Sequence, residues 1–404
     1  MINENIKVEI KGSEVGNLFY EPEKNRYGFN YTNNAMPLSL IMPYKKSTYS
    51  WNSYLHPIFD MNMPEGYLLD LFKNYLNKKY SYIDDYLIFS YLAPNIESRM
   101  TYKSWIDQKS FDSLDIQDIL ENDTKDTFES LIKMFFQKNA ISGVQPKTTA
   151  LIKDKESLTT KEYIIKAWGN EYPYLAENEY YCLKAVEKTN VKIPNIQLSN
   201  HNNFLLVERF NYNSIQDTYY GFEEILVLLG KNKDQKYSGS YEQVVKTIYE
   251  VTTDKLKSMQ DIYKTIVMNY LLKNGDAHLK NFGILYDDDF KSISFAPAYD
   301  IVNTTVYSYK DRPALTMFGK KIWYSKKHLI KFGHEQCYLS KSDAVVLYDQ
   351  CIAALEITIY ELQTYINDNI EFKNIGSRMI DTWKLSLSDK SYKELPNEIT
   401  RNWS

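Results

Sequence analysis

Arginine is scarce in this chain. Nearly all of its 48 Lys plus Arg residues are lysines, and the arginines are Arg26, Arg99, Arg209, Arg312, Arg378 and Arg401. Because arginine is the usual bidentate reader of phosphate and of guanine, this scarcity argues against base-specific DNA recognition as the main task. A net charge of -4 and a pI near 5.9 exclude a basic coat over the whole chain, but not a basic patch on one face.

Cysteine, histidine and long apolar runs are also scarce. The three cysteines, Cys182, Cys337 and Cys351, are far apart and odd in number, which favours buried thiols in a reducing compartment. The five histidines show no zinc-ligand spacing. The N-terminus is polar and charged rather than signal-like, and no run of about 18 apolar residues occurs. We therefore expect a cytoplasmic protein with no membrane partner.

What is present is the composition of an ordinary globular protein. At roughly 100–200 residues per domain, 404 residues predict two or three packed units. Hydrophobic residues make up 44% and charged residues 25% of the chain, which argues against disorder.

The hydrophobic pattern changes character along the chain. Alternating or short apolar runs predict strands, at 7–10, 15–19, 39–42, 149–152, 163–166 and 204–208. Periodicity of 3.6 residues predicts helices, at 65–75, 126–138, 177–188, 222–230, 241–251, 258–273 and 341–368. The sequence therefore predicts an α+β, two-lobed fold, with a β-rich lobe followed by a mostly α-helical lobe and a boundary near 208–212.

The most informative segment is Asn274-Gly275-Asp276-Ala277-His278-Leu279-Lys280-Asn281-Phe282. It follows an amphipathic helix, which we expect Gly275 to end. Apolar runs at 282–285 and 292–295, separated by an acidic turn, then predict a β-hairpin that leads to Tyr299 and Asp300. The chain thus presents Asp276, five residues later Asn281, then a hairpin, then Asp300.

Phosphoryl transfer from ATP requires these side chains in this order. An aspartate accepts or orients the proton of the attacking hydroxyl, while an amide and a second carboxylate hold magnesium. Protein kinases place their catalytic aspartate and metal-binding asparagine at the same D-x-x-x-x-N spacing. We assign these roles to Asp276, Asn281 and Asp300. The alternatives are a solvated loop acid at Asp276, a turn former at Asp300, and a metal pair of Asp276 with His278.

The first half should supply nucleotide contacts. Lys166 closes an apolar strand, where kinases carry the lysine that pairs with ATP phosphates, although a strand-end lysine is commonly just solvated. Glu179 on the following helix could pair with Lys166, and Glu177 is the competing candidate. The segment 142–147 contains one glycine and matches neither standard phosphate-binding loop, so a surface turn is the alternative.

Together these residues resemble the HipA-type serine/threonine kinases, toxins of bacterial toxin–antitoxin modules. The resemblance covers nearly the whole chain except 76–125. Its blocks follow the family order: Met63-Pro64-Glu65-Gly66, 141–147, Ile164-Ile165-Lys166, Asn178-Glu179, Val207-Glu208-Arg209-Phe210, Lys236-Tyr237 with Ser240-Tyr241-Glu242, 274–282, 296–301, and Ala314-Leu315 with Gly319-Lys320.

The resemblance implies a protein-kinase-like fold that binds ATP and Mg²⁺. It implies that Asp276 is the catalytic base, that Asn281 and Asp300 hold magnesium, and that Lys166 binds phosphates. The phosphate loop would be formed by Ser142, Gly143, Val144, Gln145, Pro146 and Lys147, the adenine hinge by Glu208, Arg209 and Phe210, and the cleft lining by His278, Leu279, Lys280 and Tyr299. The implied domains are an N-terminal subdomain at 1–105, a nucleotide-binding part at 106–210 and a helical lobe at 211–404.

The family resemblance also implies partners. A small helix-turn-helix antitoxin, HipB-like, would bind this chain and carry it to operator DNA. The protein substrate would be an aminoacyl-tRNA synthetase, for example glutamyl-tRNA synthetase, whose phosphorylation stalls translation and arrests growth. The alternatives are a kinase for a small-molecule hydroxyl group and an inactive kinase-like corepressor that acts with the DNA-binding antitoxin.

Two positions depart from the family pattern. Many members begin the phosphate loop with a serine whose autophosphorylation switches the kinase off, and this chain has Ala140 there. Ser142 is the substitute candidate for autophosphorylation, with a turn cap as its alternative role. Asn211 replaces the family's usual aspartate after Arg209-Phe210.

Overall fold

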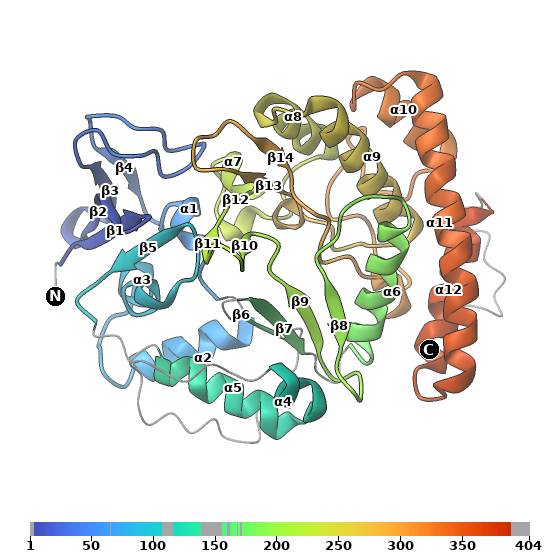
Figure 1. Ribbon diagram of the computed structural model, residues 1–404, viewed down its shortest axis with the longest axis horizontal. Coiled ribbons are helices and arrows are strands. Elements are labelled where there is room, and N and C mark those ends of the chain that lie inside the picture. Colours follow the sequence, from blue (N-terminus) through green and yellow to red (C-terminus); the bar gives the residue numbers. More distant parts are fainter. Residues whose placement is uncertain are drawn as a thin grey trace. The chain divides into compact units, whose positions relative to one another are not determined.

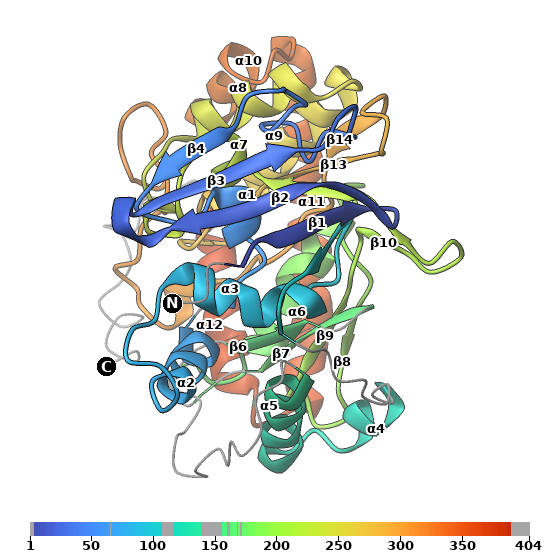
Figure 2. The ribbon, with the colours of Figure 1, turned by 90° about the vertical axis from the view of Figure 1, so that its left-hand side faces the viewer.

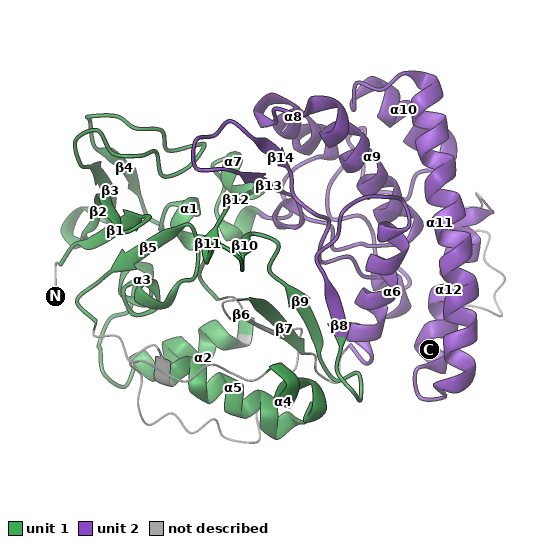
Figure 3. Cartoon of the chain, viewed as in Figure 1, with its two compact units in different colours: residues 1–171, 198–235 green, residues 172–197, 236–404 purple. Residues whose placement is uncertain are grey.

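The computed structural model describes residues 4–64, 66–106, 116–138, 156–159, 162–167, 169 and 172–388. The chain divides into two compact units (Figures 1 and 3). Unit 1 comprises 1–171 with 198–235, and unit 2 comprises 172–197 with 236–404. None of the helices in the described ranges combines the length and apolar character needed to cross a bilayer. The three-part division at 105 and 210 stays a prediction.

The first sheet of unit 1 is antiparallel and ordered β4-β3-β2-β1-β5, and Figure 2 shows β4, β3, β2 and β1 side by side. Its strands are β1 (Ile6–Ile10), β2 (Ser13–Glu21), β3 (Arg26–Tyr31), β4 (Tyr49–Asn52) and β5 (Met100–Lys103). Successive side chains of a strand point to opposite faces, and Ile6, Val8 and Ile10 are accordingly buried while Lys7 is exposed. The edge strand β5 returns from far along the chain to pair Tyr102 with Val8.

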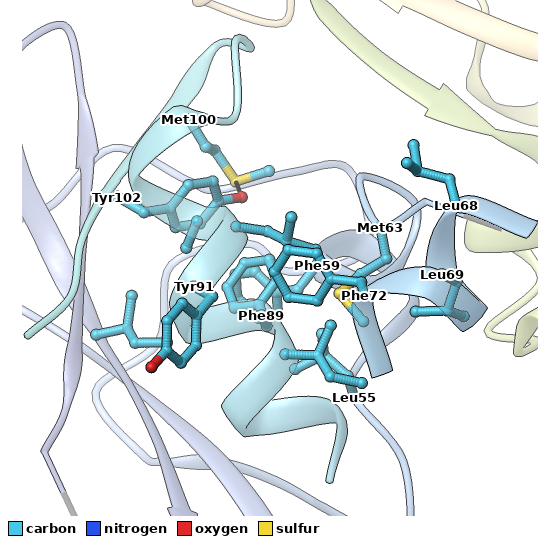
Figure 4. Packing of buried hydrophobic residues seen from close by; sticks show 14 of the residues in the cluster. Leu55, Phe59, Met63, Leu68, Leu69, Phe72, Phe89, Tyr91, Met100 and Tyr102 are labelled. Atoms are coloured by element: carbon cyan, nitrogen blue, oxygen red, sulfur yellow. Dashed lines mark hydrogen bonds between the residues drawn. The ribbon is translucent and has the colours of Figure 1, made fainter. Parts of the chain in front are cut away.

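Short helices complete the core of unit 1. They are α1 (Pro57–Asp60), α2 (Gly66–Leu76), α3 (Asp85–Leu92), α4 (Ile116–Glu121), α5 (Lys125–Lys138) and α7 (Ile225–Leu228). Aromatic rings connect them, because Phe89 lies 6.0 Å from Phe59 and 5.2 Å from Tyr102 (Figure 4). Phe72 of α2 stacks on Phe136 of α5 at 5.6 Å. One hydrophobic cluster therefore joins the first sheet to α5.

A second antiparallel sheet in unit 1 carries the predicted nucleotide contacts. It contains β6 (Glu156–Thr159), β7 (Tyr163–Ala167) and β9 (Leu205–Glu208), with β7 between β6 and β9. Lys166 of β7 is therefore flanked by Ser157 and Leu205. The chain continues through β10 (Tyr212–Asn213), β11 (Thr218–Tyr219) and β12 (Gly221–Glu224). β8 (Ile196–Leu198) lies where the chain passes from unit 2 back to unit 1.

Unit 2 is mostly helical. It contains α6 (Leu175–Glu187), α8 (Tyr241–Val251), α9 (Lys255–Leu271), α10 (Lys326–Glu335), α11 (Lys341–Asp368), α12 (Lys373–Leu387) and the hairpin of β13 (Gly283–Tyr286) with β14 (Ile293–Phe295). α9 packs against α6, α8, α11 and α12, and is buried along nearly its whole length. A capping box of Ser240 and Gln243 begins α8, and Asp254 caps α9. The predicted change from a β-rich to a helical region is confirmed.

Two of the predicted elements are wrong. Residues 39–42 form a turn instead of a strand, because Ser39 Oγ accepts a hydrogen bond from the amide of Met42 at 3.1 Å. Such local side-chain bonds compete with strand pairing. The predicted helix 222–230 begins as strand β12, and only Ile225–Leu228 is helical.

Candidate active site

The loop after α9 is fixed by Asn274, which is 1% exposed. Its Nδ2 donates to Asn269 Oδ1 at 2.8 Å, and its Oδ1 accepts from the amide of Asp276 at 3.1 Å. α9 ends at Leu271, and Lys273 takes the left-handed conformation with φ +63°. The expectation that Gly275 ends this helix is therefore wrong.

Glycine is required at position 275 because neighbouring side chains pack closely against it. Its amide donates to Thr304 Oγ1 at 2.8 Å. A Cβ atom at this position would lie 2.6 Å from Asp311 Cγ and 2.7 Å from Thr304 Oγ1. Real Cβ atoms do not approach other heavy atoms so closely, so any side chain here would force the Asp311 and Thr304 side chains to move.

We predict that Gly275→Ala lowers the free energy of unfolding by about 1–3 kcal/mol, the usual cost of overpacking. Urea denaturation of the whole chain measures this change. Adding Asp311→Ala removes the closest carboxyl group, so the double variant should recover part of the loss. A single variant as stable as the wild type would contradict the assigned close approach.

Asp276 receives a hydrogen bond that sequence reasoning missed. Tyr237 Oη donates to Asp276 Oδ1 at 2.9 Å, and the Tyr237 ring lies edge-on to His278 with 5.2 Å between ring centroids. The adjacent backbone is held to the same loop, because the amide of Leu279 donates to the carbonyl of Lys236 at 3.1 Å. The only signal in the sequence was Lys236-Tyr237 as part of a family block. Tyr237 thus orients the candidate catalytic carboxylate.

Asn281 and Asp300 are brought into direct contact. Asn281 Oδ1 accepts from the amide of His278 at 3.0 Å, and Asn281 Nδ2 donates to Asp300 Oδ2 at 2.7 Å. Asp300 is held in the left-handed region with φ +58°, which aspartate tolerates better than most residues. The hairpin β13–β14 supplies the turn of chain that returns Asp300 to Asn281.

The segment after Asp300 is anchored by two buried amides. The amide of Asn303 donates to Asn178 Oδ1 at 2.8 Å, and Asn178 Nδ2 donates to the carbonyl of Asn303 at 3.0 Å. Asn303 Nδ2 also donates to Thr382 Oγ1 at 2.7 Å. On the other side of Asp300, Tyr299 Oη donates to the carbonyl of Lys280 at 2.6 Å. Asn178 therefore helps to fix the Asp300 backbone, a role that its place in the sequence did not reveal.

Asn281 and Asp300 lie close enough together to serve one magnesium site, although Asn281 Oδ1 accepts from His278 and its Nδ2 faces Asp300. Both side chains carry hard oxygen donors, and Mg²⁺ is usually bound by one or two carboxylates together with substrate phosphates and water. Among the described residues no three His, Cys, Asp or Glu side chains come together as a metal-binding group. The donor set at Asn281 and Asp300 is therefore of the magnesium type, and His278 gains no third partner of zinc type in that part of the chain.

The remaining candidates lie in unit 1 or outside the described residues. Lys166 and Glu208 belong to the sheet of β6, β7 and β9. Arg209 is buried, which lowers its pKa, and its Nη2 donates to the carbonyl of Glu97 at 2.6 Å. Its guanidinium also lies over the Tyr219 ring at 5.0 Å, so the Arg209 side chain ties this strand end to Glu97 and Tyr219 within unit 1. The Phe210 ring packs edge-on against Phe222 at 5.3 Å.

The phosphate-loop candidates, Ala140 and Ser142, Gly143, Val144, Gln145, Pro146 and Lys147, lie outside the described residues. Glu177 and Glu179 are both buried on α6 of unit 2. A pairing of either with Lys166 stays a prediction. The structure thus brings together Asp276 with Tyr237 and His278, and Asn281 with Asp300, all in unit 2.

Comparison with known proteins places this arrangement in a family. The HipA-like C-terminal domain matches residues 139–359, and the HipA N-terminal domain matches residues 6–95. The chain belongs to the HipA family. The family predicted from the sequence motifs is therefore confirmed.

Relatives of this HipA-family chain include proteins provisionally named as kinases. One from Haemophilus influenzae is 32% identical over 187 residues, which are 42% of this chain and 54% of that protein. Y4dM from Sinorhizobium fredii is 23% identical over 203 residues, which are 45% of this chain and 49% of that protein. The chain thus spans about half the length of these relatives.

A solved structure extends the likeness to the whole chain. HipA of Shewanella oneidensis MR-1, solved in a toxin–antitoxin complex with HipB and operator DNA, has a TM-score of 0.71 and 13% identity. The match covers 98% of this chain and 99% of that one. At this identity the likeness shows the fold, and the predicted HipA fold is confirmed.

Proposed function

We propose that this HipA-family chain is an ATP- and Mg²⁺-dependent serine/threonine protein kinase. It acts as the growth-arrest toxin of a toxin–antitoxin pair and phosphorylates an aminoacyl-tRNA synthetase, glutamyl-tRNA synthetase being the first candidate. The observation that carries the proposal is the constellation of Asp276, Asn281 and Asp300. Asn281 contacts Asp300 while Tyr237 orients Asp276, as phosphoryl transfer requires.

In the proposed mechanism Asp276 accepts the proton of the attacking hydroxyl, and its hydrogen bond from Tyr237 keeps the carboxylate oriented for that transfer. Asn281 and Asp300 would hold Mg²⁺, which neutralises charge on the ATP phosphates when it is bound. Lys166 and the loop 142–147 would bind the phosphates, and residues 208–210 would border the adenine. His278, Leu279, Lys280 and Tyr299 would also contact the nucleotide, and Ser142 would be the autophosphorylation site.

The proposed partners are a HipB-like helix-turn-helix antitoxin and, through it, operator DNA. The Shewanella HipA complex supports this assignment, because that protein is bound to HipB and operator DNA. The scarcity of arginine in this chain supports leaving base recognition to the antitoxin.

The test of the proposal is radiolabelling of a host lysate with purified chain and γ-labelled ATP. Labelling of a protein band of synthetase size, dependent on Mg²⁺, is the expected result. Label that appears only in small molecules would assign the chain to the small-molecule kinases. No transfer of label, together with DNA binding in the presence of the antitoxin, would favour the corepressor.

We predict that Tyr237→Phe lowers kcat by roughly 10- to 100-fold and leaves the KM for ATP unchanged. The substitution removes a hydrogen bond to a charged group, worth about 1.5–3 kcal/mol, but keeps the ring against His278. Steady-state kinetics measures the change, with Tyr360→Phe, at a tyrosine that is 76% exposed, as the control. An unchanged kcat, or a loss confined to KM, would show that Tyr237 does not orient Asp276.

A further inference from the structure

A basic segment in unit 2 is not used by the proposed function. Residues 312–334 contain no Asp or Glu, although the whole chain has a net charge of -4. Within them lie the cationic and titratable side chains of Arg312, Lys320, Lys321, Lys326, Lys327, His328, Lys331 and His334. Aromatic residues are interleaved with these charges, at Phe318, Trp323 and Tyr324. Basic groups interleaved with aromatic rings are typical of surfaces that bind single-stranded nucleic acid.

The structure folds this segment around an open pocket of about 540 Å³. Its lining includes the three aromatic rings of Phe318, Trp323 and Tyr324, and the basic side chains of Lys320, His328 and Lys331. Small-molecule and cofactor sites typically have volumes of roughly 300–1,000 Å³. The pocket is therefore large enough for one nucleotide unit.

The aromatic wall of the pocket consists of Phe318, Trp323 and Tyr324, and hydrogen bonds from Trp323 and Tyr324 hold it in place. Trp323 Nε1 donates to the carbonyl of Asp311 at 3.0 Å, and Tyr324 Oη donates to the carbonyl of Met317 at 2.9 Å. Trp323 also packs edge-on against the buried Tyr270 at 5.6 Å, and Phe318 packs edge-on against Tyr324 at 5.7 Å. Rings fixed in this way lose little entropy when a base stacks on them.

The cations suit phosphate rather than base edges. Lys320 is exposed, and Lys331 Nζ lies 5.3 Å from the Phe318 ring centroid at the same pocket. The ion pair of Lys331 with Glu335 is exposed and long, at 3.7 Å, so it competes weakly with a ligand. Lysine binds phosphate as a point charge and lacks the fork with which arginine reads guanine. A phosphate group held by these lysines would therefore be bound independently of base sequence.

We infer that this pocket binds a nucleoside phosphate, with the base against Phe318, Trp323 and Tyr324 and the phosphate on Lys320 and Lys331. The ligand is either one unit of a single-stranded nucleic acid or a free nucleotide. Asp276, Asn281 and Asp300 are not among the residues that line this pocket, and the inference does not depend on kinase activity.

The test measures binding of fluorescein-labelled U10 to the full-length chain by anisotropy, without ATP, over a series of salt concentrations. Lys320→Gln with Lys331→Gln should weaken binding and reduce the slope of log K against log salt by about 1.4, because each contact with a single-stranded phosphate contributes about 0.7. The control, Lys192→Gln with Lys384→Gln, removes two exposed lysines outside the pocket and should leave both values unchanged. Equal slopes in the two double variants would overturn the inference.

Two further arms test the aromatic wall and the source of the ligand. Tyr324→Leu should weaken U10 binding roughly 5- to 100-fold, while Tyr324→Phe, which keeps the ring and loses only the hydrogen bond to Met317, should bind more tightly than Tyr324→Leu. Both variants are accompanied by thermal melts, so that unfolding is not mistaken for lost stacking. Displacement of U10 by UMP would identify a free nucleotide, and displacement by unlabelled oligonucleotides alone a strand. Binding of fluorescein-labelled decaglutamate with no binding of U10 would assign the surface to an acidic protein and overturn the inference.

Discussion

Asp276→Asn should reduce phosphoryl transfer by about 10²–10⁴-fold, the usual contribution of a positioned general base. The amide keeps the size of the carboxylate, and its oxygen still accepts from Tyr237, so the loop geometry is preserved. What the variant loses is the ability to accept the proton of the attacking hydroxyl. Growth arrest upon expression should disappear together with transfer, since the proposed toxicity requires phosphorylation.

The experiment compares purified wild type and Asp276→Asn in ATP-dependent labelling, and both genes in a growth assay. Asp289→Asn is the matched control, because this side chain is 65% exposed and lies in the turn between β13 and β14. Nucleotide binding should survive in Asp276→Asn, since the substitution changes no residue of the proposed phosphate or magnesium set. A variant that remains active and toxic would remove Asp276 from the mechanism, and toxicity without transfer would separate growth arrest from kinase chemistry.

Local sequence signals predicted the helices of unit 2 closely. The predicted helix 241–251 coincides with α8, and 341–368 coincides with α11. Both begin at a serine whose side chain accepts a backbone N–H, Ser240 or Ser340, so a boundary signal and hydrophobic periodicity agree. Where the sequence carries both signals, little is left for tertiary contacts to decide.

Contacts between distant residues were beyond the same reasoning. Tyr237 and Asp276 are 39 positions apart, and no periodicity connects them. Gly275 looked like a helix terminator because glycine often is one, whereas Asp311 and Thr304 decide its role through packing. The order Asp276, Asn281, Asp300 could be proposed as a site because the chemistry of phosphoryl transfer limits which side chains can serve. The residues that position these side chains could not be predicted from the sequence, because many side chains can make a supporting hydrogen bond.

Asp300→Asn should abolish the Mg²⁺-dependent part of ATP binding while leaving the apo fold intact. Asparagine, like aspartate, tolerates the left-handed conformation that position 300 adopts, and its oxygen can still accept from Asn281 Nδ2. The variant therefore loses the negative charge and little else. Asp300→Ala is the informative companion, because it also places alanine in a left-handed backbone, at a cost of roughly 1–2 kcal/mol.

Thermal melting measures both effects in the same instrument. With ATP and Mg²⁺ at 100 times Kd, the wild type should gain about 2.7 kcal/mol of stability. With ATP and EDTA the gain should be much smaller. Without ligand, Asp300→Asn should melt at the same temperature as the wild type, and its melting temperature should rise by the same small amount in both ATP mixtures. Asp300→Ala should melt at a lower temperature even without ligand. Retention of the Mg²⁺-dependent shift in Asp300→Asn would contradict the magnesium assignment. A lowered apo melting temperature in that variant would mean that the Asp300 charge stabilises the fold rather than the metal.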